Sequence, residues 1–370
     1  MSDLTTAPIP DAARPTRGPV LWRPKRLLVT PAALDWEHGR SIVARAEGAG
    51  LPVTRLKVNR LSDLTGEDAR RTYVKAKSTL AIVAAPPTKL RLQPIPPSAD
   101  WRVDLAEGCP AHCQYCYLAG SLSGPPVTRA YANLPEILDN LVSYVGRGAV
   151  TSRSEARAHE GTTFEASCYT DPLGIEHLTG SLAAAIEHFG AWDAPVQLRF
   201  TTKFDAVAPL LHLDHGGRTR ARFSVNAAPL VARFEGGTAG LDARLAAMAA
   251  MAGAGYPVGL TVAPIMAVEG WRELYADLVE RTRAALAGIP GLDLTAELIT
   301  HRFTPGSKSV LLDWYPATRL DLDETTRSRK TTKFGSLKFV YTPQVMAELK
   351  AFLLARFADR LPEARVLYWT

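Results

Sequence analysis

The chain has few cysteines and no long apolar run. It carries 4 cysteines in 370 residues, and no stretch approaches the roughly 18 uninterrupted apolar residues of a membrane-spanning helix. Its first residues, MSDLTTAPIPDAARPTRGPV, lack the charged start and apolar segment of a secretory signal. We therefore expect a cytoplasmic protein that neither spans a membrane nor is exported.

The composition also lacks the marks of disorder, which are low hydrophobicity and a large excess of one charge. With 46% hydrophobic and 22% charged residues, the chain matches ordinary globular proteins. Lysine and arginine number 43 against 37 acidic residues, which gives a formal net charge of +6. This excess permits a polyanionic partner such as DNA without requiring one.

Apolar periodicity divides the chain into four parts. Residues 1–24 are rich in Pro, Thr and Arg and predict a flexible N-terminal arm. Alternating strand and helix patterns predict a small α/β domain over 25–97 and a larger one over 98–304. Residues 305–370 form a C-terminal extension, in which a hairpin precedes a helix from Pro343 to Arg360 and a closing strand.

The larger domain contains six strand-like segments separated by amphipathic stretches. These segments are WRVDLAEG, TTFEASC, VQLRFTT, ARFSVN, YPVGLTVAP and LDLTAELIT. Strand and helix in alternation indicate a parallel sheet, and six strands are too few for a complete eight-stranded barrel. The predicted fold is α/β, with an incomplete (β/α)6 barrel, a small N-terminal α/β layer and a C-terminal β-hairpin/helix extension.

Three of the cysteines, Cys109, Cys113 and Cys116, lie on one short segment, and Cys168 stands alone. Clustered cysteines in a chain without an export signal favour a metal or cluster site over disulfides. Thiolates are the preferred ligands of iron–sulfur clusters, and a four-iron cluster takes four of them. Three ligands would leave one iron open to a substrate or cofactor, as in catalytic metal sites.

Other interpretations of the cysteines remain open at this point. The spacing would also place them on one face of a helix, although Pro110 opposes a helix there. Zinc could take the three thiolates with His112 or Cys168, and Cys113 and Cys116 could form a redox disulfide. Ligand softness and spacing favour the cluster.

The motif C-x-x-x-C-x-x-C, with an aromatic residue before its last cysteine, resembles the signature of radical S-adenosylmethionine (AdoMet) enzymes. Further segments, from about Lys75 to the C-terminus, resemble the spore photoproduct lyase family. They are GCPAHCQYCYL, RAYANLPEI, FEASCYTDPLGIEHL, LRFTTKFDAV, RFSVN, GYPVGLTVAPI, EGW, HRFTPGSK and YPATRLDLDETTR.

The resemblance implies that Cys109, Cys113 and Cys116 ligate a [4Fe–4S] cluster whose open iron binds AdoMet. Reductive cleavage of AdoMet in this family yields a 5′-deoxyadenosyl radical, which abstracts hydrogen from the cross-linked thymine pair called spore photoproduct. The implied function is a DNA repair lyase that restores two thymines. We expect double-stranded DNA carrying the lesion and an electron donor such as a flavodoxin or ferredoxin as partners, and a monomeric enzyme.

The resemblance also assigns roles to Cys168, Tyr115 and Tyr117. Cys168 matches the cysteine that returns a hydrogen atom to the product thymine radical, and the two tyrosines match residues thought to relay the electron back. Independently, Cys168 ends a predicted strand, at the edge of the sheet where ligands bind. The alternatives are a small buried cysteine and tyrosines that only pack around the cluster.

Polar residues at other strand ends are further candidates. Thr170, Lys203, Ser224 and Asn226 lie where the family contacts its cofactor, and Lys203 could bind a carboxylate by a charge-assisted hydrogen bond. The alternative for Lys203 is a solvated lysine at a sheet edge.

Contacts to DNA are predicted after the sixth strand and on the C-terminal hairpin. His301 and Arg302 are candidates for substrate phosphate contacts, against a local salt bridge as the alternative. Lys333 and Phe334 occupy the place of an arginine and a tyrosine that family members often carry. The basic residues of the predicted hairpin are Arg327, Arg329, Lys330, Lys333 and Lys338.

Two other functions compete with lesion reversal. One is a radical AdoMet enzyme acting on a different nucleic-acid lesion or modification. The other is a DNA-binding protein whose iron–sulfur cluster is structural or redox-sensing. Cys168 argues against the second, because a hydrogen donor has no purpose in a binding module, and an exposed basic loop is the alternative for the hairpin.

Overall fold

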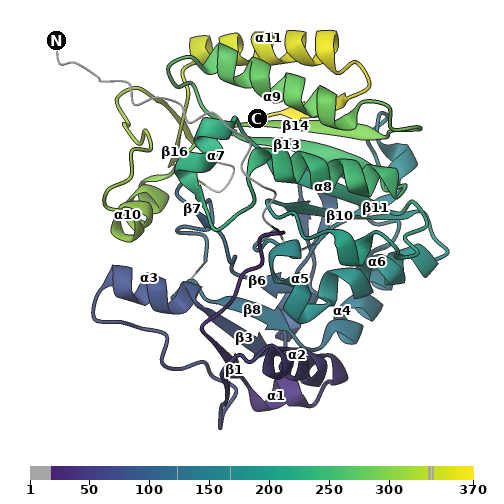
Figure 1. The fold of residues 1–370 in the computed structure, drawn as a ribbon, viewed down its shortest axis with the longest axis vertical. Helices are drawn as coiled ribbons and strands as arrows, with labels where there is room; N and C mark the ends of the chain where they lie inside the picture. The colour runs from purple at the N-terminus through teal and green to yellow at the C-terminus, as the bar shows by residue number, and fades with distance from the viewer. Residues whose placement is uncertain (1–17, 123, 167, 332–334, 336) are drawn as a thin grey trace.

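The computed structural model describes residues 18–122, 124–166, 168–331, 335 and 337–370. Two sheets organise this part of the chain, with the N-terminal sheet at one end of the molecule and the larger sheet at the other (Figure 1). Within the described residues, no helix combines the length and apolarity that crossing a membrane requires.

The larger sheet has eight strands and is open. From one edge to the other they are β17 (Arg365–Trp369), β14 (Leu294–Thr300), β13 (Val258–Ile265), β11 (Thr219–Val225), β10 (Val196–Thr202), β9 (Thr162–Ala166), β5 (Ala99–Val103) and β4 (Gln93–Ile95). The six predicted strands are the adjacent parallel strands β5, β9, β10, β11, β13 and β14. The sheet is larger than predicted, because β17 adds a parallel strand and β4 an antiparallel one.

The helices that join these strands do not follow a strict one-to-one alternation. They are α4 (Leu134–Asn140), α5 (Leu173–Thr179), α6 (Ser181–Ala191), α7 (Ala228–Phe234), α8 (Leu241–Gly253) and α9 (Trp271–Leu286). Between β10 and β11 the chain forms only a 3₁₀ turn, Ala208–Leu210. The expected (β/α)6 regularity therefore fails at this connection, where Pro209 and the Gly216–Gly217 pair interrupt the chain.

The N-terminal sheet has the order β2 (Val53–Arg55), β1 (Arg26–Val29), β3 (Thr79–Val83), β8 (Thr128–Tyr131) and β6 (Ala106–Glu107). Its helices are α1 (Pro31–Leu34), α2 (Glu37–Gly48) and α3 (Ala69–Lys77). Because β6 and β8 follow β5 in the chain, the boundary expected at residue 97 does not separate the two sheets. The two layers are instead interleaved along the sequence.

Part of the expected N-terminal arm, residues 18–24, lies within the described residues. Residues 18–24 have no helix or strand, yet they are held against the larger domain. The backbone N–H of Val20 donates to Asp205 Oδ1 at 2.8 Å, and His177 Nε2 lies 2.9 Å from the carbonyl oxygen of Trp22. These contacts fix residues that composition alone assigned to a flexible segment.

The C-terminal extension contains α10 (Pro305–Trp314), the hairpin strands β15 (Ser328–Thr331) and β16 (Leu337–Val340), and α11 (Pro343–Arg360). The hairpin and the last helix confirm the prediction. Lys333 and Phe334 lie outside the described residues. Arg327 was expected among the exposed basic residues, but its side chain is 1% exposed, because it pairs with Asp321 and stacks on Tyr341.

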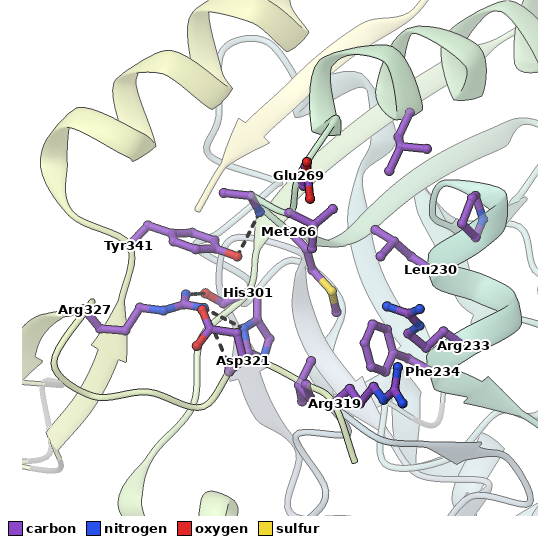
Figure 2. A pocket seen from close by; sticks show the side chains of 15 residues that line it. Leu230, Arg233, Phe234, Met266, Glu269, His301, Arg319, Asp321, Arg327 and Tyr341 are labelled. Carbon is purple, nitrogen blue, oxygen red and sulfur yellow. Dashed lines mark hydrogen bonds and ion pairs between the residues drawn. The ribbon is translucent and has the colours of Figure 1, made fainter. Parts of the chain in front are cut away.

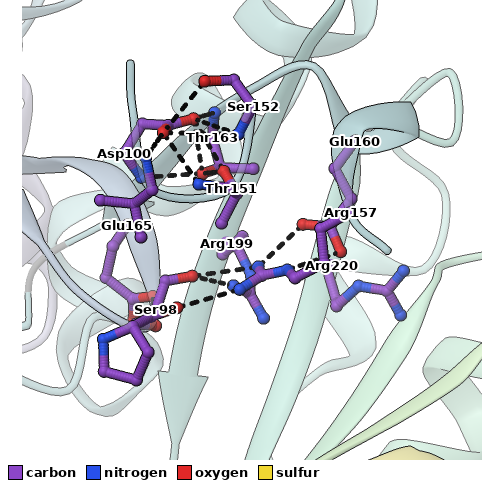
Figure 3. Close-up of polar contacts among 12 residues, drawn as sticks. Ser98, Asp100, Thr151, Ser152, Arg157, Glu160, Thr163, Glu165, Arg199 and Arg220 are labelled. Carbon is purple, nitrogen blue, oxygen red and sulfur yellow. Dashed lines mark hydrogen bonds and ion pairs between the residues drawn. The ribbon is translucent and has the colours of Figure 1, made fainter. Parts of the chain in front are cut away.

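The two faces of the larger sheet differ in chemistry. Along β10, Leu198 and Phe200 are buried in the main apolar core, and between them Arg199 points to the opposite face. Arg199 pairs there with Glu297 of β14 at 2.9 Å, and Arg222 of β11 pairs with the same carboxylate at 2.7 Å. Figure 3 shows Arg199 reaching Ser98, beside a second polar group built around Asp100.

Candidate active site

The segment with three cysteines is a loop anchored by a short two-stranded ribbon. Strand β7 (His112–Cys113) pairs with β12 (Glu235–Gly236), which sets Cys113 opposite Glu235. The ribbon continues as the N–H of Gln114 donates to the carbonyl oxygen of Phe234 at 2.9 Å. The cysteines therefore do not lie on a helix, which removes the helical-stripe interpretation.

All four cysteines are free thiols, and those of the loop are buried or half-buried. Burial raises the pKa of Cys109 to about 12, against the opposing effect of the Lys77 ammonium. Burial also raises the pKa of Cys113, and Lys203 opposes it. Ligation requires thiolates, so these positions suit a metal group that supplies the compensating positive charge.

The loop supplies three thiols, which are soft donors. Each thiolate on a four-iron cluster binds a different iron. Soft thiol donors facing two ammonium groups, Lys77 and Lys203, fit a [4Fe–4S] cluster.

Lys203 is the centre of a polar group at the carboxyl end of β10. Its Nζ donates to Ser224 Oγ at 2.9 Å, to Tyr115 Oη at 3.1 Å and to Glu235 Oε1 at 3.1 Å. Burial alone would raise the pKa of Glu235, but Lys203 and Arg244 together hold it below its ordinary value. The structure thus brings together Lys203, Ser224 and Tyr115, and adds Glu235, which sequence reasoning missed.

A second missed residue is Asp171. Its carboxylate accepts from the Thr202 hydroxyl at 2.8 Å and from the backbone N–H of Lys203 at 2.6 Å. Burial raises the pKa of Asp171 to about 6. The signal in the sequence was its place directly after Thr170, beyond the end of β9.

Thr170 and Asn226 differ in what their side chains contact. The Thr170 hydroxyl oxygen is buried, and no described residue forms a hydrogen bond with it. An orphaned buried hydroxyl at a strand end fits a ligand contact. The Asn226 amide is already used, because Nδ2 donates to Pro264 O at 2.7 Å and Oδ1 accepts from the Tyr275 hydroxyl at 3.1 Å.

Tyr115 and Tyr117 point to different partners. The Tyr117 hydroxyl donates to the main-chain oxygen of Cys168, so the lone cysteine lies against the loop that carries the other three. The Tyr115 hydroxyl donates to Glu235, within the Lys203 group. Burial, with Glu165 and Asp104 nearby, raises the pKa of Cys168, which keeps its sulfur in the S–H form at neutral pH.

A cavity of about 340 Å³ opens beyond the carboxyl ends of β13 and β14 (Figure 2). Its lining combines apolar and charged side chains and includes Leu230, Phe234, Met266, His301, Arg319 and Tyr341. Phe234 precedes Glu235 in the chain, so one lining residue is covalently linked to a member of the Lys203 group.

His301 and Arg302 are adjacent in sequence, but their side chains lie in different surroundings. His301 is 2% exposed, and burial together with Arg327 lowers its pKa to about 3. A neutral histidine in the cavity wall suits a phosphate contact poorly. Arg302 is exposed and lies near Lys338 of β16, whose pKa is lowered by burial and by the charges of Arg302 and Lys330.

Comparison with known proteins gives one consistent result. The family model described as spore photoproduct lyase matches residues 22–370. Spore photoproduct lyases from a Geobacillus species and from Bacillus subtilis are each 39% identical over 348 residues, covering 94% of this chain and 98% of theirs. The spore photoproduct lyase of Clostridium acetobutylicum is 30% identical over 344 residues.

Solved structures of spore photoproduct lyases match this chain over nearly its whole length. A mutant spore photoproduct lyase with bound AdoMet and dinucleoside spore photoproduct superposes with a TM-score of 0.86 at 39% identity. The match covers 94% of this chain and 99% of that one. A spore photoproduct lyase complexed with dinucleoside spore photoproduct gives the same score and coverage. The open, parallel-rich sheet described above is thus the half-barrel of these structures.

Proposed function

Because this chain belongs to the spore photoproduct lyase family, we propose that it repairs DNA by converting spore photoproduct back to two thymines. The observation that carries this function is the contact between two parts of the site. Tyr117, from the loop with Cys109, Cys113 and Cys116, donates its hydroxyl to the main chain of Cys168. A hydrogen donor is thus held beside the place where a radical would be generated.

The three loop cysteines are the proposed ligands of a [4Fe–4S] cluster, and AdoMet is the proposed cofactor. When bound and reduced, this pair supplies a 5′-deoxyadenosyl radical. Lys203 and Ser224 can bind the polar end of AdoMet, since both lie at strand ends next to the loop. The unpartnered hydroxyl of Thr170 offers a further hydrogen bond. The cavity beside Phe234 can receive the nucleoside end.

Cys168 is the proposed donor of the hydrogen atom that completes repair. Its S–H bond breaks as a C–H bond forms on the product thymine radical, and the unpaired electron stays on sulfur. The raised pKa of Cys168 supports this role, because a thiolate has no hydrogen atom to give. Tyr117 and then Tyr115 are the proposed route by which a hydrogen atom from the methyl group of 5′-deoxyadenosine would reach the Cys168 sulfur, which would re-form its S–H bond and return the unpaired electron to the cofactor.

The proposed partners are duplex DNA carrying the lesion and a small electron-transfer protein such as a flavodoxin or ferredoxin. We propose that the enzyme works as a cytoplasmic monomer. Chemistry on a base requires that the base leave the helical stack, which costs least at damaged positions. Arg302, Lys330 and Lys338 form a positive cluster that is suited to the neighbouring phosphates.

The decisive test uses full-length protein reconstituted with iron and sulfide under anaerobic conditions. We expect it to cleave AdoMet and to convert synthetic dinucleotide spore photoproduct to thymidylyl-thymidine, measured by chromatography with mass detection. A Cys113→Ala variant should do neither, because it lacks one cluster ligand. AdoMet cleavage without any thymine release would indicate a radical enzyme with a different substrate.

A further inference from the structure

Helix α3 of the N-terminal layer contacts the cysteine loop with two side chains from one face. Tyr73 and Lys77 lie four residues apart, which places them one above the other on the helix. The Tyr73 hydroxyl lies 2.8 Å from His112 Nδ1. One turn further along, Lys77 Nζ donates to the carbonyl oxygens of Cys109 and Ala111.

Lys77 is a buried cation without a carboxylate partner. Its side chain lies in the interior, with the residue 6% exposed. Within the described ranges, no Asp or Glu oxygen lies within 4.0 Å of its ammonium, whereas Lys203 is paired with Glu235 and Lys89 with Glu107. Two carbonyl oxygens replace part of the lost hydration but carry no net charge. A buried ammonium is stable only near a compensating negative charge.

The cysteine loop, whose carbonyl oxygens Lys77 binds, would carry this compensating negative charge. Three thiolates bring three negative charges, and a four-iron cluster bound by them has a net negative charge that grows on one-electron reduction. Lys77 is placed to act on this charge, since its buried ammonium already binds the backbone of the loop at Cys109 and Ala111. A fixed positive charge close to the cluster favours the reduced state, because it stabilises the added electron.

We propose that Lys77 is a positioning residue that fixes the cysteine loop and balances the charge of its cluster. The N-terminal layer then sets how firmly the cluster is held and how easily it accepts an electron. This inference rests on the proposed function only in assuming a [4Fe–4S] cluster, and it does not depend on which lesion is repaired. Electrons reach the cluster from an external one-electron donor, which is dithionite in the experiment below.

The test compares Lys77→Met with Lys75→Met in the full-length, anaerobically reconstituted protein. Methionine keeps the unbranched shape and most of the length of the lysine side chain and removes its charge. Lys75 is the matched control, because it lies on the same helix but at the surface, paired with the exposed Asp63. The measurements are iron and sulfide content, the rate of iron loss to a chelator, and the midpoint potential by dithionite titration followed by electron paramagnetic resonance.

We expect Lys77→Met to lower the reduction equilibrium constant about tenfold, which for one electron is a fall of about 59 mV in midpoint potential. Iron should also leave several-fold faster than from the wild type. Lys75→Met should match the wild type in both. A Lys77→Met protein whose potential and iron retention equal those of Lys75→Met would overturn the proposal.

Two further variants keep the proposal testable if Lys77→Met does not fold, which far-ultraviolet circular dichroism of the apoprotein would reveal. Lys77→Arg keeps the charge and should keep the wild-type potential. Lys77→Gln keeps a hydrogen-bond donor without the charge and should show the lowered potential. Equal potentials in these two variants would refute the role of charge. A wild-type protein that binds no cluster would instead refute the proposed function itself.

Discussion

Cys168 and Tyr117 show how single residues acquire a role from their position. Free cysteine is commonly a small buried apolar residue, and nothing in its own sequence neighbourhood excludes that role for Cys168. The structure places it two residues beyond the last residue of β9, Ala166, with the Tyr117 hydroxyl bonded to its main-chain oxygen. Tyr117 is 59% exposed, so its side chain is open to solvent while its hydroxyl contacts Cys168.

Replacing Cys168 with alanine should separate the start of the reaction from its end. We expect Cys168→Ala to keep its iron content and AdoMet cleavage, because the residue ligates no iron. Lesion should still be consumed, but most of the thymine radical should be diverted to side adducts, as measured by mass spectrometry of the products. If this variant released thymine without side adducts, Cys168 would not be the hydrogen-atom donor.

Residues such as Glu235 and Asp171 mark the limit of sequence reasoning at this scale. Lys203 and Ser224 could be proposed from their places at strand ends. Glu235 could not, because its role depends on the ribbon that pairs β12 with β7, over a hundred positions away. Asp171 follows Thr170 directly, but only the fold aims its carboxylate at Lys203.

At the scale of elements, the C-terminal hairpin brings like charges together. Lys330 and Lys338 are paired directly across β15 and β16, an arrangement that is unfavourable unless an anion lies nearby. Arg302 adds its charge to the same cluster. The hairpin was predicted from its sequence, whereas the approach of Arg302 was decided by the packing of the extension on the sheet.

Substitution of Lys330 should weaken DNA binding without changing the chemistry. For Lys330→Ala we expect weaker binding to a lesion-containing duplex, since one phosphate contact is lost. The slope of the logarithm of the binding constant against the logarithm of the salt concentration should become shallower by about one unit. Turnover of the dinucleotide lesion should be unchanged. Fluorescence anisotropy over a range of salt concentrations measures duplex binding, and product analysis measures turnover of the dinucleotide.

The control for this prediction is Arg272→Ala. Arg272 is an exposed cation of α9 that pairs with Glu348, away from the hairpin. The Arg272→Ala substitution should leave duplex binding and dinucleotide turnover unchanged. If Lys330→Ala lost activity equally on the duplex and on the dinucleotide, the hairpin would not be a DNA-binding element.

At the scale of the whole molecule, one face of the larger sheet is held by buried charges. Glu297 pairs with Arg199 and Arg222 from two other strands, so three strands are tied through one carboxylate. Burial alone would raise the pKa of Glu297, but the two arginines hold it at about 2. Its folded pKa therefore lies below the ordinary glutamate value of 4.5.

Removing this carboxylate should destabilise the protein strongly. We expect Glu297→Ala to lower the free energy of unfolding by about 3 to 5 kcal/mol, because the buried Arg199 loses its carboxylate partner and Arg222 keeps Glu165 but loses Glu297. The wild-type contribution should be complete above pH 4.5 and lost as the pH falls toward 2, since the native state binds fewer protons there. Urea unfolding at several pH values measures both effects.

The exposed Glu348 provides the comparison, because its pair with Arg272 is at the surface. Glu348→Ala should change stability by less than about 1 kcal/mol. A loss for Glu297→Ala no larger than this would show that the buried network contributes little.

The sequence by itself determined the six central strands, the terminal helix and the family, and it predicted the cysteine ligands, because these depend on spacing and periodicity within short segments. The tertiary structure alone decided which distant groups meet: Lys77 with the cysteine loop, Glu235 with Lys203, and β6 and β8 with the N-terminal sheet. It also buried Arg327, which was predicted as a basic residue of the hairpin, and His301, which was predicted as a candidate phosphate contact. The physical reason is that burial and pairing are set by contacts between residues far apart in the chain, on which local patterns carry no information.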